Sequence, residues 1–180
     1  YVKRTASLES LEQYLAGKIP ELINTPLHSI KYRIKDFESF YQKVSRKQYD
    51  QPFSQCTDLV GCRIICLFKD QISEIVESLS EEFRIVEAVK KHASANEFSY
   101  NSTHLVAAIK RNAQAPSEIK GQPFEIQIRT ILQEAWAEVE HYLNYKHIGV
   151  DEQLLRKINA LSALFEIADD QFQQVHESFR

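Results

Sequence analysis

Several features that mark common classes of protein are missing from this sequence. It has no methionine, so we expect a trimmed chain whose natural ends lie further out, and it has three cysteines, Cys56, Cys62 and Cys66. An odd number of cysteines without a CxxC pair is typical neither of a secreted disulfide framework nor of a zinc site, so we expect buried free thiols and no structural metal. No apolar run approaches the ~20 residues that span a bilayer, and the N-terminus lacks a signal-peptide core. We therefore expect a cytoplasmic protein with no membrane association.

The chain also has few glycines and a small net charge. The chain has four glycines and no Gly-rich phosphate loop, which argues against a conventional P-loop kinase. Its formal net charge of −3 argues against a general nucleic-acid coat. The charge is uneven, because residues 28–50 are basic and residues 151–180 are acidic, and an anionic ligand would favour the first region. What remains, 43% hydrophobic and 26% charged residues in a chain of 180, is ordinary for one globular domain.

Helical and strand patterns alternate along the chain. Apolar residues at helical spacing predict a helix that begins near Thr5 or Ser7 and ends at Pro20, and a second helix that Asp70 caps. Strands are predicted at Phe83–Val89 and, after a polar loop, at Leu105–Ile109. These elements predict an α/β or α+β layer fold with a central sheet.

The stretch 124–130 predicts the strand around which the fold is organised. Its apolar residues alternate with Glu125, Gln127 and Arg129, so the strand has one apolar and one polar face. A polar strand face is often merely solvated. A carboxylate, an amide and a guanidinium in line would equally form the floor of a site for phosphate and metal, and periodicity alone leaves both interpretations open.

A helix is predicted to follow this strand directly. Thr130 is a suitable N-cap, after which the apolar residues recur at helical rather than strand spacing. The residues expected on the inward side of this helix are Ile131, Ala135, Trp136, Val139 and Leu143. Glu134, Glu138 and His141 are expected on its other sides.

A second strand-to-helix junction is basic. The segment His28–Lys35 alternates so that all of its cations leave one strand face: Lys31, Arg33 and Lys35. Asp36 then caps a helix in which Ser39 and Lys43 lie one turn apart. The end of a strand beside a helix N-terminus suits an anion, because backbone N–H groups and lysines both point there. The alternative is a solvated basic surface.

A third strand is predicted to be buried on both faces. Asp58 lies at its beginning, and Arg63 lies within the apolar run that continues to Phe68. A buried arginine needs a partner or an opening to water, because an unpaired buried charge costs several kcal/mol, on the order of 3–5 when a pair is broken. An ion pair with a nearby carboxylate would satisfy it, and so would a place in a ligand site.

Several separated segments together resemble one family. They read Glu-Ile-Gln-Ile-Arg-Thr, Ala-Trp-Ala-Glu-Val-Glu-His and Asn-Tyr-Lys, and Arg33-x-Lys35 with Ser39 and Lys43 adds to them. In this order they resemble the RelA/SpoT-type alarmone synthetases, closest to the stand-alone small alarmone synthetases. The resemblance implies a nucleotidyltransferase-like mixed sheet flanked by helices, with a long C-terminal helix. It divides the chain into an N-terminal helical segment (1–29), a synthetase core (30–146) and a C-terminal helix (147–180).

The resemblance also implies roles for individual residues. For ATP binding it implies Arg33, Lys35, Ser39, Lys43 and Arg63, with the two arginines flanking adenine. For catalysis and for binding of Mg²⁺ it implies Asp58 and Glu125. For the acceptor nucleotide it implies Tyr100, His104, Gln127 and Arg129.

The acceptor loop departs from the family pattern. Tyr100, Ser102 and His104 have the family's spacing, in which the tyrosine stacks on guanine. Where the family has glycine before the tyrosine and lysine three residues earlier, this chain has Ser99 and Asn96. These departures leave the acceptor as the least constrained part of the prediction.

The C-terminal segment predicts a helix with a regular apolar seam. Its members alternate spacings of four and three: Leu154, Ile158, Leu161, Phe165, Ala168, Phe172, Val175 and Phe179. Such a seam packs back on its own domain or on another subunit. Small alarmone synthetases are typically oligomers built through terminal helices, so the resemblance implies a homo-oligomer.

The implied activity is transfer of the β,γ-pyrophosphate of ATP to the 3′-hydroxyl of GDP or GTP, which makes the stringent-response alarmones ppGpp and pppGpp. No His-Asp dipeptide occurs, so the hydrolase of the long family members is not expected. One alternative is a toxic relative that pyrophosphorylates the 3′ end of tRNA. Others are a degenerate nucleotide-binding module and a helix-mediated assembly domain.

Overall fold

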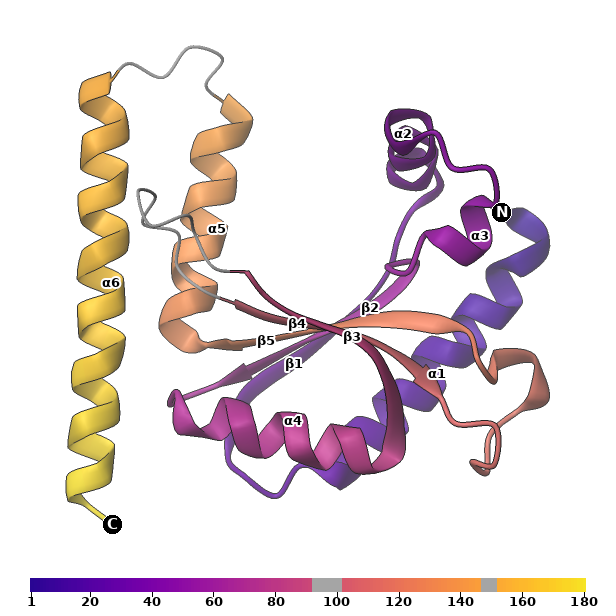
Figure 1. Cartoon of the computed structure of the whole chain (residues 1–180), viewed down its shortest axis with the longest axis horizontal. Coiled ribbons are helices and arrows are strands. Elements are labelled where there is room, and N and C mark those ends of the chain that lie inside the picture. The colour runs from indigo at the N-terminus through magenta and orange to yellow at the C-terminus, as the bar shows by residue number, and fades with distance from the viewer. Residues whose placement is uncertain (92–101, 147–151) are drawn as a thin grey trace.

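The computed structural model describes residues 1–91, 102–146 and 152–180 (Figure 1). Its helices are α1 (Thr5–Leu22), α2 (Phe37–Lys47), α3 (Pro52–Gln55), α4 (Asp70–Glu82), α5 (Ile131–Lys146) and α6 (Glu152–Ser178), with 3-10 turns η1 (Val2–Arg4) and η2 (Ser117–Ile119). Its strands are β1 (Leu27–Ile34), β2 (Val60–Cys66), β3 (Phe83–Lys91), β4 (Ser102–Ile109) and β5 (Pro123–Thr130). Within the described ranges, no helix is both long and apolar enough to cross a membrane.

The strands form one mixed sheet in the order β1-β2-β5-β4-β3. The central strands β2 and β5 run parallel, and the other neighbouring pairs are antiparallel. Helices α1 and α4 lie on one side of the sheet, whereas α5 and α2 rise from the other side at opposite ends (Figure 1). The mixed sheet flanked by helices that the sequence predicts is therefore confirmed.

Side-chain alternation in β5 separates the core from the site. Phe124, Ile126 and Ile128 are fully buried in the core, together with residues of α1 and α4. The intervening residues of β5 point to the opposite side. The prediction that β2 is buried on both faces is wrong in part, because half-buried Gly61 and Arg63 interrupt its apolar run on the polar side of the sheet. The three cysteines are buried free thiols, as predicted.

The start of α5 is held by a reciprocal cap. The Gln133 backbone N–H donates to Thr130 Oγ1 at 3.1 Å, and the Thr130 backbone N–H donates to the Gln133 side-chain oxygen at 3.0 Å. This confirms Thr130 as the N-cap and explains why the strand turns into a helix without a loop.

The predicted inward face of α5 is wrong in part. Trp136 is buried, but Ala135 is exposed and Val139 is 47% exposed, while Glu134 is buried. The reason is that α5 lies over the polar face of the sheet, where charged and amide side chains need polar partners. Hydrophobic periodicity therefore indicated the wrong side of this helix.

Two predicted helix boundaries also differ. Helix α1 continues through Pro20 to Leu22, because a proline in the last turn costs little more than one hydrogen bond while the apolar side of the helix stays in the core. Asp36 caps α2 as expected, since its side chain accepts from the Ser39 backbone N–H. Asp70, however, is the first residue of α4 and makes no cap bond. Its carboxylate is 3.0 Å from Arg180 at the end of α6, and its backbone N–H donates to the side-chain oxygen of Gln173 on the same helix at 3.1 Å.

Helix α6 packs alongside α5 and runs back past the sheet (Figure 1). The Trp136 and Phe165 rings lie 5.6 Å apart, and Thr130 Oγ1 donates to buried Asp169 at 2.9 Å. The predicted seam is only partly inward, because Phe165 is half-buried whereas Phe172 and Val175 are 52% and 53% exposed. The early member Leu161 is already 46% exposed, while the polar neighbours Ser162 and Asp169 are buried, so the inward side of the helix lies beside the predicted seam and includes polar residues.

Candidate functional site

Two rows of side chains cross the sheet on the side away from α1 and α4. Strand register aligns the first row as Lys31, Arg63, Gln127 and His104. The second row is Arg33, Gly61 and Glu125. Residues 31, 33, 61, 63, 125 and 127 therefore meet although they are far apart in the chain, because β1, β2 and β5 are neighbours.

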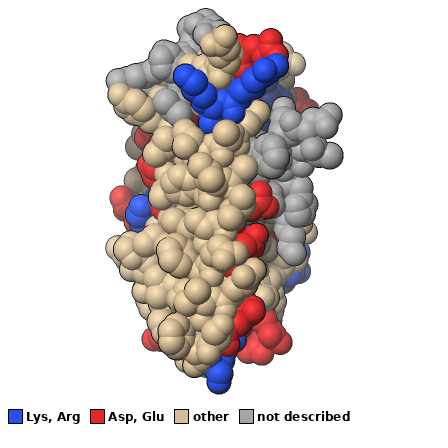
Figure 2. Space-filling view, turned by 90° about the vertical axis from the view of Figure 1, so that its left-hand side faces the viewer, with Lys and Arg blue, Asp and Glu red and all other residues tan. Residues whose placement is uncertain are grey.

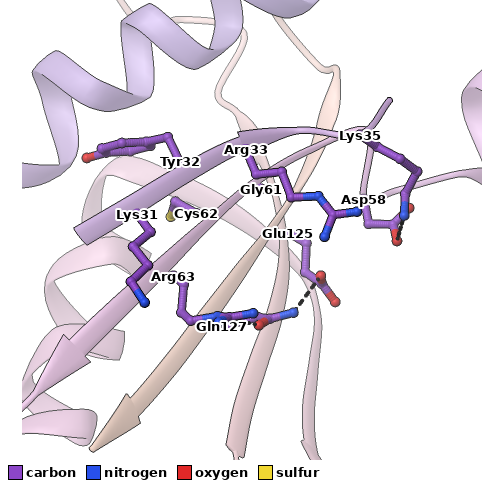
Figure 3. Close-up of a pocket in the computed structure, with 10 residues that line it drawn as sticks. All are labelled: Lys31, Tyr32, Arg33, Lys35, Asp58, Gly61, Cys62, Arg63, Glu125 and Gln127. Carbon is purple, nitrogen blue, oxygen red and sulfur yellow. Dashed lines mark hydrogen bonds and ion pairs between the residues drawn. The ribbon is translucent and has the colours of Figure 1, made fainter. Parts of the chain in front are cut away.

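These rows form the floor of a cavity of about 430 Å³ (Figure 3). Gly61 lies between Arg33 and Glu125, and a Cβ atom at this position would come within 3.4 Å of the Glu125 carbonyl oxygen. The missing side chain leaves room above the floor. The cavity is lined by Lys31, Tyr32, Arg33, Lys35, Asp58, Gly61, Cys62, Arg63, Glu125 and Gln127.

Asp58 lies at one side of the cavity between two lysines. Its Oδ2 is 3.2 Å from Lys35 Nζ and 2.8 Å from Lys43 Nζ. Cys56 Sγ donates to its other oxygen at 3.1 Å. Burial raises the pKa of Asp58, but the hydrogen bonds from Lys43 and Cys56 and the charge of Lys35 outweigh it and lower the pKa to about 2. The aspartate is fully ionised at neutral pH.

Glu125 has different neighbours. His104 Nδ1 lies 3.2 Å from its Oε1, and the Gln127 amide donates to its Oε2 at 3.1 Å. Ser102 Oγ is 2.7 Å from the other ring nitrogen of His104. The hydrogen bond with His104 is the main cause that lowers the pKa of Glu125, and burial and the nearby charge of Asp58 oppose it. Ser102 and His104 were expected in a loop but lie in β4, because they continue its pairing with β3 and β5.

Arg33 extends into the cavity between Asp58 and Glu125 (Figure 3). It lines the cavity, and within the described part of the chain it forms no salt bridge. Ser39 does not line the cavity. Its hydroxyl donates to Asp36 Oδ2 at 2.7 Å, so in this structure Ser39 serves the cap of α2.

Arg63 has the carboxylate partners that one interpretation of the sequence required. It is 2.8 Å from Glu134 and 2.9 Å from Glu138, both on α5. Arg129 does not line the cavity and instead bonds to Glu134 at 3.1 Å. Its predicted acceptor role is therefore not reflected in its contacts here.

A family profile described as the region found in RelA / SpoT proteins matches residues 32–149, more than half of the chain. The chain belongs to the RelA/SpoT family. The matched region contains the whole cavity floor apart from Lys31, and it ends just after α5.

Curated and solved relatives agree with this assignment. GTP pyrophosphokinase YjbM of Bacillus subtilis is 30% identical over 156 residues, which are 84% of this chain and 73% of the relative. Small alarmone synthetase 2 from Bacillus subtilis superposes with a TM-score of 0.85 at 25% identity and covers 99% of this chain and 98% of its own. Small alarmone synthetase 1 from the same organism, bound to its product pppGpp, gives 0.75 at 28% identity, with coverage of 96% and 92%.

Within this RelA/SpoT chain, the predicted acceptor residue Tyr100 lies outside the described residues, as do Asn96 and Ser99. Sequence reasoning missed the structural importance of two residues, Lys31 and Glu134. Glu134 stands one turn after Thr130, a spacing that could have shown it to lie beside the end of β5.

Asp58 and Glu125 suit a magnesium ion. Both line the same cavity, and the charge of Asp58 raises the pKa of Glu125, so the two carboxylates lie within electrostatic range. Mg²⁺ is usually held by one or two carboxylates together with phosphate oxygens and water. No group of three or more His, Cys, Asp or Glu side chains that could hold a metal ion is present in the described ranges.

Proposed function

We propose that this protein transfers the β,γ-pyrophosphate of ATP to the 3′-hydroxyl of GDP or GTP, releasing AMP and forming ppGpp or pppGpp. The observation that carries the proposal is the meeting of Asp58, Glu125, Arg33 and Lys35 in one cavity. A transfer of this kind depends mainly on positioning and on neutralising phosphate charge. The relatives named as GTP pyrophosphokinase and as a small alarmone synthetase bound to its product pppGpp support the choice of acceptor and product.

The ATP phosphates bind on the Asp58 side of the cavity. Lys35 and Lys43 are already placed there, and Arg33 points into the same space. Arg33 and Arg63 flank the adenine, to which planar guanidinium groups bind well by stacking. Lys43 does not line the cavity, but it lies beside it because its ammonium group bonds to Asp58. Ser39 lies in the first turn of α2, so it would contribute to phosphate binding as part of the N-terminus of this helix.

Glu125 serves the acceptor. It removes the proton from the 3′-hydroxyl directly or through water, and the hydroxyl oxygen then attacks the β-phosphorus while the bond to the AMP oxygen breaks. His104 and Gln127 hold the carboxylate in place. Tyr100 stacks on the guanine of the acceptor in this proposal.

Mg²⁺ is the proposed cofactor, held by Asp58 and Glu125. When bound, it neutralises the phosphate oxygens and polarises the phosphorus that is attacked. Lys35 and Lys43, which bond to Asp58, would then compete with the metal for this carboxylate. Because the phosphates offer the lysines other anionic partners, metal and phosphates would bind together.

A homo-oligomer formed through α6 is part of the proposal, and so is the division into 1–29, 30–146 and 147–180. The outward side of α6 is apolar, with Leu164 60% exposed and Ile167 57% exposed. An apolar helix side of this extent is typical of an interface.

Incubation with labelled ATP and Mg²⁺ tests the proposed reaction, with GDP, GTP and tRNA offered separately as acceptors. Formation of a labelled guanosine product and AMP is expected. A labelled tRNA with unmodified guanosine nucleotides would replace the proposal with the tRNA-modifying activity. If no acceptor is modified, the protein is a nucleotide-binding module.

A further inference from the structure

One nearly buried carboxylate on α5 contacts cations from three neighbouring strands. The Glu134 side chain is 9% exposed. Its Oε1 accepts from Lys31 Nζ at 2.9 Å and from Arg63 at 2.8 Å, and its Oε2 accepts from Arg129 at 3.1 Å. Strands β1, β2 and β5 each supply one of these cations. Glu134 therefore ties three strands of the site to one helix.

The cluster depends on the charge of Glu134. Burial raises the pKa of Glu134, but hydrogen bonds from Lys31 and Arg63 outweigh burial and hold the pKa below its ordinary value. The carboxylate is thus ionised at neutral pH. Without it the three cations would repel one another in a partly desolvated place, and each would turn towards water.

Arg63 passes the effect of Glu134 to the cavity. Its Nε donates to the Gln127 side-chain oxygen at 3.2 Å. Because the amide oxygen accepts this bond, the amide nitrogen faces the other way, and it donates to Glu125 Oε2 at 3.1 Å. A continuous chain of side chains therefore leads from α5 to the carboxylate that faces the cavity.

We propose that Glu134 is a positioning residue of the nucleotide site, which holds Arg63 and thereby sets the orientation of Gln127 and of Glu125. The residue does not line the cavity itself but bonds Arg63 and Lys31, which do, and Arg63 is its link to Gln127 and Glu125. This inference rests on the proposed function, because Arg63 and Glu125 are the groups that would meet the nucleotides.

Three variants separate positioning from mere charge. Glu134→Gln keeps the size of the side chain and removes its charge. Glu134→Asp keeps the charge but shortens the side chain by one methylene group. Glu138→Gln is the matched control, since Glu138 is 63% exposed and shares only the contact with Arg63. Melting temperatures identify any variant that fails to fold, and Glu134→Asp then carries the test.

The first readout needs no activity. The Arg63 Nε–H signal in proton–nitrogen NMR spectra, assigned with an Arg63→Lys variant, reports whether the guanidinium is held. We expect it to be shifted or broadened in both Glu134 variants and nearly unchanged in Glu138→Gln. An Arg63 signal that is the same in folded Glu134 variants and wild type would overturn the inference.

The second readout is affinity for a methylene analogue of ATP with Mg²⁺, measured by titration calorimetry. We expect a loss of about tenfold or more in Glu134→Gln, a smaller loss in Glu134→Asp, and less than about twofold in Glu138→Gln, where tenfold is about 1.4 kcal/mol. Equal losses in the Glu134 and Glu138 variants would overturn the inference. If the wild type does not bind the analogue at all, the proposed function fails, and the Arg63 signal still decides the role of Glu134.

Discussion

At the scale of single residues, the two carboxylates of the cavity differ in their neighbours. Asp58 lies between two lysines, whereas Glu125 lies against an imidazole and an amide. A carboxylate among fixed cations keeps its charge and suits binding of metal and phosphate. A carboxylate beside groups that can exchange or share a proton suits removal of one. The proposed roles of the two residues follow from this difference.

Glu125→Gln should preserve the fold and remove most pyrophosphate transfer. The change keeps the side chain's size but deletes the charge that binds metal or accepts a proton, and general-base catalysis alone is worth about 10²–10⁴-fold. Transfer from labelled ATP measures the effect, with the melting temperature as control. Near-normal transfer by a well-folded variant would remove Glu125 from the mechanism.

Asp58 should make the free energy of unfolding depend on pH in the acidic range. Its pKa is about 2 in the fold against 3.8 ordinarily, so its contribution is complete above about pH 4 and is lost as the pH falls towards 2. The shift corresponds to about 2 kcal/mol at 1.36 kcal/mol per unit. Between these pH values the free energy of unfolding should fall more steeply in wild type than in Asp58→Asn, as urea titrations can measure. Equal slopes would contradict this assignment.

At the scale of elements, the site depends on which strands are neighbours and on the absence of a side chain at one position of β2. Strand β2 lies between β1 and β5 and carries Gly61 where its neighbours carry Arg33 and Glu125. Helix α5 covers one end of this polar face, and α2 contributes Lys43 at the other. The cavity therefore lies where the cross-strand row lacks a side chain, at Gly61, and it is bounded by two helices.

Gly61→Val should weaken nucleotide binding more than it weakens the fold. Valine suits a strand, but its methyl groups would occupy the floor between Arg33 and Glu125. We expect affinity for an ATP analogue to fall by about tenfold or more, which is about 1.4 kcal/mol of lost contact. Gly61→Ala is the control, because its Cβ would come no closer than 3.4 Å to the Glu125 carbonyl oxygen. The cavity is not the nucleotide site if valine leaves binding unchanged.

At the scale of the whole molecule, α6 presents an apolar side with no covering element in the described part of the chain. Figure 2 shows this outward side, where uncharged residues run along the length of the molecule and charged side chains gather at its ends and along one edge. The same helix makes polar contacts with its own domain, including Lys69, just before α4, to Asp170 at 2.6 Å and Thr130 of β5 to buried Asp169. These polar contacts, together with the Trp136–Phe165 ring contact, hold the helix on its domain, while its apolar side stays exposed.

Phe172→Glu should dissociate the proposed oligomer. A carboxylate at a half-exposed aromatic position places a charge in an apolar interface, at a cost of several kcal/mol or on the order of 3–5 when it is left unpaired. Light scattering coupled to gel filtration measures the mass of wild type and variant at matched concentrations. Gln174→Glu, an exposed polar position on the same helix, is the control. A monomeric wild type would contradict the oligomer itself.

Local patterns predicted much of this molecule. Alternation in residues 124–130, the caps at Asp36 and Thr130, and the apolar run after Asp58 are each satisfied within a few residues, so their physical cause is visible in the sequence. The family resemblance added which distant segments meet, and the fold and the RelA/SpoT assignment agree with it.

Tertiary structure decided what each surface faces. Hydrophobic periodicity assigned the wrong side of α5, because that helix covers a polar sheet face and buries Glu134 instead of Val139. It placed Ser102 and His104 in a loop, because pairing with β3 and β5 is a property of strands far away in the sequence. It predicted an unbroken apolar seam on α6, although the helix turns Ser162 and Asp169 inward and leaves Leu161 and Phe172 exposed. A sequence determines the pattern on one element, whereas the partner surface, which lies elsewhere in the chain, determines which part of that pattern is buried.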